Sequence, residues 1–209
     1  MSQNNNTNDI FDQQTINDLL IKSEKGDSDA MNKLGNYYFD NCDTKLMLKY
    51  YQKAISLKNI DAMNSLGCYY RIVGDDKNAI ICFEAAVNLG DPLGMANMGS
   101  YYYDIKDYDN MIKYDEMAIA LGNELATNNL AKYYWSINKI DKMRELFQMN
   151  IKKENVDAMY YLGNYYEEKE NYPKMMVYYR LASKSGHEDA SKRLTMWINR
   201  FSNRVVYNC

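Results

Sequence analysis

The chain has 209 residues, 28 acidic and 25 basic side chains, a net charge of −3 and a sequence pI near 5.3, so it offers no basic field for nucleic acid or anionic lipid. No apolar run approaches the roughly 20 residues of a membrane span, and the polar start MSQNNNTNDI lacks the apolar core of a secretory signal. We therefore expect a cytoplasmic protein with neither nucleic-acid nor membrane partners.

The cysteine pattern argues against a disulfide framework or a zinc site. Cys42, Cys68, Cys82 and Cys209 do not recur at equivalent positions and form no CxxC pair. Reduced thiols in a cytosol-like compartment are expected. The 25 Asn and 21 Tyr against 2 Pro are typical of AT-rich genomes such as those of amoebae, some parasites and giant DNA viruses, and a viral protein would act in the host cytoplasm.

The chain is predicted to begin with a polar terminus and a single helix. Residues 1–10 are Asn-rich and are expected to be disordered. Residues 11–25 place Ile16, Leu19 and Leu20 at helical spacing, like the second helix of a hairpin that lacks its first helix. We predict that this segment is a cap helix.

One nine-residue segment then recurs at a fixed interval of 32 residues. The first copy is AMNKLGNYY at Ala30–Tyr38. The others are Ala62–Tyr70, Gly94–Tyr102, Ala126–Tyr134 and Ala158–Tyr166, and a degraded sixth copy starts at Ala190. A fixed period of this length indicates one supersecondary unit stacked on copies of itself. We predict five units, 30–61, 62–93, 94–125, 126–157 and 158–189.

Each unit reads as two helices. Ala30, Leu34 and Tyr38 are four residues apart and share one face of a first helix, while Met47 and Tyr51 belong to the stripe of a second helix. Acidic residues that precede most first helices are predicted to cap or favour their amino ends: Asp29, Asp61, Asp157 and Asp189. Asp43, Asp75, Asp107 and Asn171 are predicted to cap the second helices, and Gly26, Gly90, Gly122 and Gly186 to close them.

A glycine recurs inside the first helix, where it costs about 1 kcal/mol relative to alanine. These residues are Gly35, Gly67, Gly99 and Gly163. We expect close approach of the second helix to explain them, with alanines of that helix as the small partners: Ala54, Ala86, Ala118 and Ala182.

The repeat array is predicted to end in a second cap helix. Residues 190–201 place Leu194, Trp197, Ile198 and Phe201 like a lone first helix, and residues 202–209 form a tail too short for another packed helix. Because one unit cannot bury its own apolar faces, we expect a single repeat domain over residues 11–201 with about twelve helices.

The L-G-x-Y-Y core, followed by Ala twenty residues after the Leu, resembles the tetratricopeptide repeat, as in Leu34 to Ala54. YYQKAISLKNIDAM (50–63) and YYRLASKSGHEDA (178–190) resemble the Sel-one-like subfamily more closely, although the period is shorter than the tetratricopeptide 34 and the Gly-rich loop within the unit is mostly missing. The resemblance implies an all-α, right-handed α/α superhelical solenoid. It also implies scaffold, adaptor or chaperone-like roles through protein binding, without catalysis.

By analogy with such repeats, the first helices line a concave side. The candidate partner-binding residues on that side are Asn32, Asn36, Phe39, Asn64, Arg71, Tyr103, Asn128, Lys132, Trp135 and Asn164. Their Asn amides can donate to and accept from an extended backbone, and Tyr103 and Trp135 are candidate aromatic anchors. The alternative is drift in an Asn-rich chain whose units arose by duplication.

The fourth unit departs most from the pattern. Ala131 replaces the helical Gly, Asn150 replaces the packing Ala, and Glu154 replaces the closing Gly. Two interpretations stay open, which are a specialised contact surface around Trp135 and a joint that tolerates looser packing.

We find no residue pattern for catalysis, a cofactor or a metal. The single histidine, His187, lies in a turn without a second His or a nearby Cys, and no nucleophile with a base, P-loop or dinucleotide fingerprint occurs. The sequence thus favours a non-enzymatic scaffold or adaptor that binds a peptide or partner protein on the concave face. A structural protein that self-associates through the array is the alternative, and the oligomeric state is left open.

Overall fold

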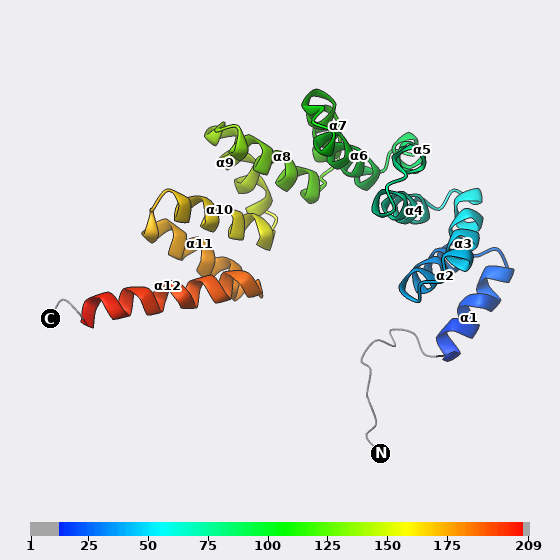
Figure 1. Ribbon diagram of the computed structural model, residues 1–209, viewed down its shortest axis with the longest axis horizontal. Coiled ribbons are helices and arrows are strands. Elements are labelled where there is room, and N and C mark those ends of the chain that lie inside the picture. The colour runs from blue at the N-terminus through cyan, green and yellow to red at the C-terminus, as the bar shows by residue number, and fades with distance from the viewer. Residues whose placement is uncertain (1–12, 207–209) are drawn as a thin grey trace, which may run out of the picture. The chain divides into compact units, whose positions relative to one another are not determined.

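The computed structural model describes residues 13–206, and in that range it contains twelve α-helices and no strand (Figure 1). The chain divides into two compact units, Met1–Tyr101 (unit 1) and Tyr102–Cys209 (unit 2). The predicted all-α fold of tandem helical hairpins is confirmed. The predicted disorder of residues 1–10 lies outside the described residues.

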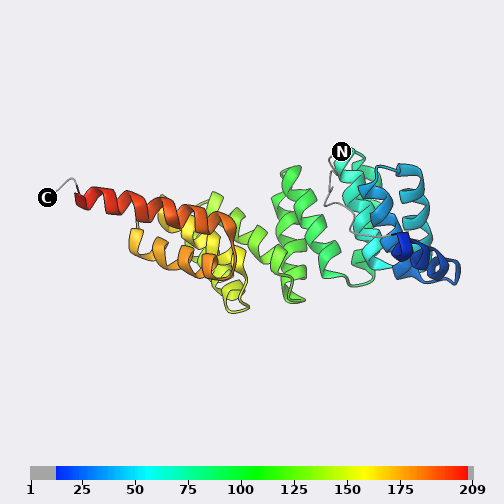
Figure 2. The ribbon, with the colours of Figure 1, turned by 90° about the horizontal axis from the view of Figure 1, so that it is seen from below.

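Unit 1 contains α1 (Gln13–Glu24), α2 (Ser28–Asp40), α3 (Thr44–Ser56), α4 (Ile60–Ile72), α5 (Asp76–Asn88) and most of α6 (Pro92–Asp104). The hairpins α2/α3 and α4/α5 are visible in Figure 1 and Figure 2 as paired antiparallel helices. The core of this unit includes Leu34, Met47, Tyr51, Ala54 and Leu66, which are the apolar stripes of both helix types.

Unit 2 contains α7 (Tyr108–Ala120), α8 (Glu124–Ser136), α9 (Ile140–Ile151), α10 (Val156–Glu168), α11 (Tyr172–Lys184) and α12 (Glu188–Val206). Its hairpins are α8/α9 and α10/α11, and α12 packs on α11. α12 continues to Val206, beyond the predicted end of the cap helix at residue 201. Trp197 and Phe201 of α12 pack around Tyr172.

The second helices are capped as predicted, by side chains of Asp43, Asp75, Asp107 and Asn171. The caps of the first helices lie two residues earlier than predicted. Asp27 caps α2 and Asn59 caps α4, whereas Asp29 and Asp61 lie in the first helical turn. The reason is the turn itself, because the residue that follows the closing left-handed position is extended and so becomes the cap.

The turns between successive 32-residue repeats close in the left-handed conformation, as predicted for Gly26, Gly90, Gly122 and Gly186. The equivalent Lys58 and Glu154 adopt the same conformation without glycine, with φ of 60° and 63°. The turns inside the hairpins also need a positive φ, and only Gly74 among them is glycine. Closing backbone bonds such as Asn59 N–H to the Ala54 carbonyl, at 3.1 Å, hold these residues there.

The helical glycines have a different partner from the one predicted. A Cβ on Gly35, Gly67 or Gly163 would lie within 2.4–2.5 Å of a ring carbon of Tyr51, Phe83 or Tyr179, so the glycine makes room for an aromatic ring of the second helix. Ala86 of α5 packs instead against the first helix of the next hairpin, α6, where a Cβ on Gly94 would lie 2.7 Å from the Cβ of Ala86. The prediction of an alanine partner was wrong, because the ring rather than the alanine faces the first helix of its own hairpin.

Candidate functional site

Unit 1 carries a pocket on the surface formed by its first helices. Its volume is about 330 Å³. We call it the first-helix pocket, and the residues that line it are Asn36, Phe39, Tyr51, Asn64, Ser65, Cys68, Tyr69, Ile72, Leu93 and Asn97. The predicted candidates Asn36, Phe39 and Asn64 are therefore brought together, by α2 and α4.

The amide of Asn64 is held inside the protein. Asn64 is buried, its Nδ2 donates to Asp91 Oδ2 at 2.7 Å, and its Oδ1 accepts from Asn97 Nδ2 at 3.2 Å. Asp91 Oδ2 also accepts the Gly94 backbone N–H at 2.6 Å at the start of α6. Asn64 thus connects α4 to the beginning of α6 and makes the floor of the pocket rather than a free contact.

Asn36 lies at the exposed edge of the pocket. Its Oδ1 accepts from the Tyr51 hydroxyl at 2.7 Å. Burial raises the pKa of Tyr51 to about 12, and a hydrogen bond with Ser65 opposes that rise. The pKa of the Cys68 thiol is also raised by desolvation, with Arg71 opposing it, so both groups are neutral at pH 7.

A second pocket of about 440 Å³ adjoins the first, and the two share Phe39 and Tyr69. These two rings meet edge to face with centroids 6.3 Å apart, and Phe39 is 41% exposed. Asp40 and Cys42 line the second pocket but not the first. Phe39 is therefore an exposed ring between two hollows of the same surface.

The two remaining candidate binding residues of unit 1, Asn32 and Arg71, are less exposed to solvent than Asn36 and Phe39. Asn32 is partly buried, and its Oδ1 is buried without a hydrogen-bond partner within the described residues. Arg71 of α4 is also partly buried and has contacts of its own.

In unit 2, Asn128 repeats the role of Asn64. It is buried, its Nδ2 donates to Asn155 Oδ1 at 3.1 Å, and its Oδ1 accepts from Asn150 Nδ2 at 2.8 Å. Asn155 caps α10 and also donates to Glu124 Oε2 at 2.6 Å. One departure of the fourth repeat, Asn150, thus completes a buried amide network between hairpins.

The aromatic candidates differ in exposure. Trp135 is partly buried, lies edge-on to Tyr165 at 5.9 Å, and donates from Nε1 to Glu168 Oε2 at 3.1 Å. Tyr103 is 47% exposed and packs edge-on against Tyr108 at 6.1 Å. Trp135 is therefore a packing residue of the α8–α10 surface, whereas Tyr103 is more open to solvent.

Lys132 and Asn164 complete the predicted set. Lys132 is exposed, and its Nζ lies 5.3 Å from the centroid of the Tyr161 ring. Asn164 Oδ1 accepts from the Tyr179 hydroxyl at 2.7 Å, and that hydroxyl also bonds to the Glu167 carboxylate. Arg193 of α12 pairs with Glu167 at 2.8 Å, so Asn164 belongs to a closed polar network.

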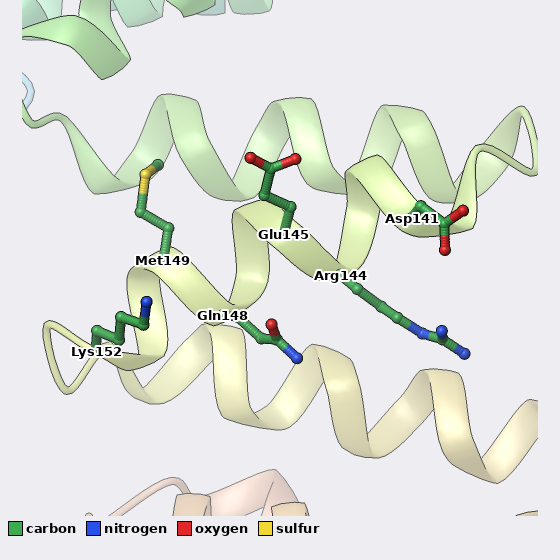
Figure 3. A pocket seen from close by; sticks show the side chains of 6 residues that line it. All are labelled: Asp141, Arg144, Glu145, Gln148, Met149 and Lys152. Atoms are coloured by element: carbon green, nitrogen blue, oxygen red, sulfur yellow. The ribbon is translucent and has the colours of Figure 1, made fainter.

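A hollow of about 420 Å³ lies on the second-helix side of unit 2, along α9 (Figure 3). Its lining is Asp141, Arg144, Glu145, Gln148, Met149 and Lys152, all from one helix or its end. Arg144 extends toward α10 and donates to the Tyr165 hydroxyl at 3.4 Å. Side chains of mixed charge at helical spacing make this a solvated helix face, and sequence reasoning did not select it.

Sequence reasoning also missed a buried carboxylate. Asp115 of α7 is 1% exposed, and neither carboxylate oxygen has a hydrogen-bond partner in residues 13–206. Burial raises its pKa to about 7, and Lys132 of α8 opposes that rise. The repeat pattern could have identified Asp115, because the residues at the equivalent position of the other repeats are all aromatic: Tyr51, Phe83, Phe147 and Tyr179.

The described part of the chain holds no group of three or more His, Cys, Asp or Glu side chains arranged for a metal ion. No helix within that part is long and apolar enough to cross a membrane. The single histidine, His187, accepts the Ala190 backbone N–H through Nδ1 at 3.2 Å and stacks on Tyr160.

Comparison with known proteins supports the same architecture. A tetratricopeptide repeat model matches residues 28–61 and 60–89. No curated protein sequence matches the chain. A Sel1 repeat protein from Oxalobacter formigenes shares 22% identity at a TM-score of 0.69, with 87% of this chain and 82% of that chain covered.

The chain has the fold of a tetratricopeptide-like repeat protein. The c5321 protective antigen of uropathogenic Escherichia coli, which displays an SLR fold, shares 21% identity at a TM-score of 0.62, and the match covers 90% of this chain but only 44% of that chain. The human IFIT1 dimer with PPP-AAAA shares 18% identity at a TM-score of 0.70, with 92% of this chain and 51% of that chain covered. Identities this low show the fold alone.

Proposed function

We propose that this chain is a non-enzymatic scaffold or adaptor that binds a peptide or partner protein on its first-helix face. The observation that carries the proposal is the first-helix pocket, which gathers Asn36, Phe39 and Asn64 around a hollow of about 330 Å³. Tetratricopeptide-like folds generally mediate protein–protein interactions, which supports this choice of function class. The second-helix side offers a solvated charged surface along α9 instead.

The proposal is tested with a photo-crosslinking amino acid placed at single positions of the full chain in its native cell. Cys68 lines the pocket, whereas the exposed Glu84 lies on second helix α5 of the same unit. We expect a specific crosslinked partner from position 68 and none from position 84. Crosslinks from position 84 alone would contradict the proposal.

A further inference from the structure

The first-helix pocket has no charged residue in its lining. The chain as a whole has 28 acidic and 25 basic side chains, yet all ten lining residues are neutral, and burial keeps the thiol of Cys68 and the phenol of Tyr51 protonated. A charged ligand group would lose water here without meeting an opposite charge. The lining therefore favours an uncharged occupant.

The other repeats act as an internal control for two residues at this pocket. Ile72 is 73% exposed, and the equivalent positions in the other four units are all polar: Asp40, Asp104, Ser136 and Glu168. Leu93 is 40% exposed, and its equivalents are the acidic Asp61, Asp157 and Asp189 in three of the other four units, with Leu125 as the exception. In the second repeat, two solvent-facing positions that are mostly polar in the other repeats are therefore apolar, and both line the same pocket.

Two side-chain amides of the same pocket, those of Asn36 and Asn97, each keep one group without a hydrogen-bond partner within residues 13–206. Asp91 accepts hydrogen bonds only, so Asn64 must give it the Nδ2 donor and turn Oδ1 toward Asn97. Asn97 then donates with Nδ2, and its Oδ1 has no partner in the described part of the chain. Likewise, Asn36 accepts from Tyr51, and its Nδ2 has no partner there.

These two groups lie on α2 and α6, on either side of α4. Packed helices are about 8–10 Å apart, so the two groups are separated by at most about 20 Å. An extended chain advances about 3.3 Å per residue, so roughly five or six residues cross this span. A backbone carbonyl is the partner that Asn36 Nδ2 requires, and a backbone N–H is the partner that Asn97 Oδ1 requires.

We infer that the first-helix pocket takes an extended, uncharged segment of a partner protein, with a large apolar side chain between Phe39, Ile72 and Leu93 and backbone hydrogen bonds to Asn36 and Asn97. The inference rests on the proposed function and adds the chemistry of the partner. Charged segments are excluded by the neutral lining.

The probes are capped heptapeptides of Ser and Gly with one central guest residue, which is leucine, phenylalanine, alanine, aspartate or lysine. Binding to the full chain is followed by NMR through the backbone amide of Cys68 and the side-chain amides of Asn36 and Asn97. We expect saturable shifts with leucine and phenylalanine, and binding weaker by about tenfold or more with the other guests, since they lose the burial of the apolar side chain. Equal shifts for all guests, or none for leucine and phenylalanine, would overturn the inference.

Three variants test the named contacts. Ile72→Asp and Leu93→Asp restore the acidic residue that other repeats carry at these exposed positions, and Asn36→Asp keeps the acceptor for Tyr51 but removes the free donor. We expect each to weaken binding of the leucine peptide by about tenfold or more. The matched control is Leu125→Asp, which changes the position equivalent to Leu93, is 48% exposed and lies outside the pocket, and it should bind as the wild type does.

Binding by the partner distinguishes the proposed function from the further inference. If the crosslinked partner from position 68 binds the Ile72→Asp and Leu93→Asp variants as tightly as the wild type, the inference is wrong while the proposed function stands. If position 68 gives no crosslink, the proposed function is wrong, whatever the peptides show.

Discussion

At one position of the second helix, the third repeat replaces an aromatic ring with the carboxylate of Asp115. The ring position is fully buried in the hairpins of unit 2 that carry Phe147 and Tyr179. A carboxylate buried without a hydrogen bond is stable there only when it is protonated, which is why its pKa is raised to about 7. Asp115 is therefore a position at which the fold opposes ionisation.

Asp115 makes stability depend on pH. Its native pKa of about 7 is above the usual value of 3.8, so the folded state holds the proton more tightly than the unfolded state. The contribution of Asp115 to stability is then most favourable below about pH 4 and falls as the pH rises toward 7, by up to about 4 kcal/mol for a shift of about three pKa units. Urea unfolding between pH 4 and pH 8 measures this slope.

Asp115→Asn is the control, because an amide of the same shape does not titrate in this range. We expect the stability difference between wild type and variant to shift in favour of the variant as the pH rises from about 4 to about 7 and to level off above that. A difference that is constant from pH 4 to pH 8 would show that Asp115 is ionised or solvated in the native state.

The candidate residues show how far sequence reasoning reaches at this scale. The repeat correctly indicated which positions lie on the first helices, and three of its candidates do line one pocket. It did not separate Asn36, which keeps a free Nδ2, from Asn64, which is buried against Asp91 and Asn97. That difference depends on hydrogen-bond partners at the start of the next hairpin, and the spacing of residues within one helix does not predict those partners.

At the scale of the helix, the caps also join one hairpin to the next. Asn155 accepts the Ala158 N–H at 2.9 Å, accepts from Asn128, and donates to Glu124. Asn171 caps α11 by accepting the Lys174 N–H at 3.2 Å. Both residues are N-cap asparagines, but within residues 13–206 only the side chain of Asn155 also makes hydrogen bonds to the preceding hairpin.

This difference is measurable as a free energy of unfolding. We expect Asn171→Ala to cost about 1 kcal/mol, as for a simple cap. Asn155→Ala should cost about 2–3 kcal/mol, because it also leaves the buried Asn128 amide without an acceptor. Denaturant unfolding of the two variants compares them directly, and equal losses would mean that the bonds between hairpins contribute nothing.

The elements themselves were largely predictable, and their joints less so. Periodicity and the caps Asp43 and Asp75 placed the helices. Only the repeat register marks Lys58 and Glu154 as left-handed positions, because their residue types do not favour this conformation and closing backbone bonds hold them there. The ring opposite Gly67 was missed because an i, i+4 pattern shows which face is buried but not which neighbour fills it.

At the scale of the whole molecule, stability should be local to each unit. In repeat arrays each element contacts mainly its neighbours, so a defect is felt most strongly nearby. Tyr179 is fully buried at the joint with Gly163 in unit 2. We expect Tyr179→Ala to increase hydrogen exchange in α10–α12 and to leave α2–α5 unchanged, as measured by mass spectrometry. Equal loss of protection throughout would show a single cooperative core.

Self-association through the array stays a prediction at this scale. The exposed side chains of α1 include Gln14, Asp18 and Lys22, which stacking on that end would bury. We therefore expect one molecular mass by light scattering at all protein concentrations. A mass that rises with concentration would favour the assembly alternative over the scaffold.

The most direct test of the scaffold account is the affinity of the partner that crosslinks at position 68, measured by titration calorimetry against the wild type, Ile72→Asp and Leu125→Asp. We predict a loss of about tenfold or more for Ile72→Asp, because it places a charge in the neutral pocket, and no change for Leu125→Asp. A partner that is weakened by Leu125→Asp and unaffected by Ile72→Asp would contradict binding at this surface.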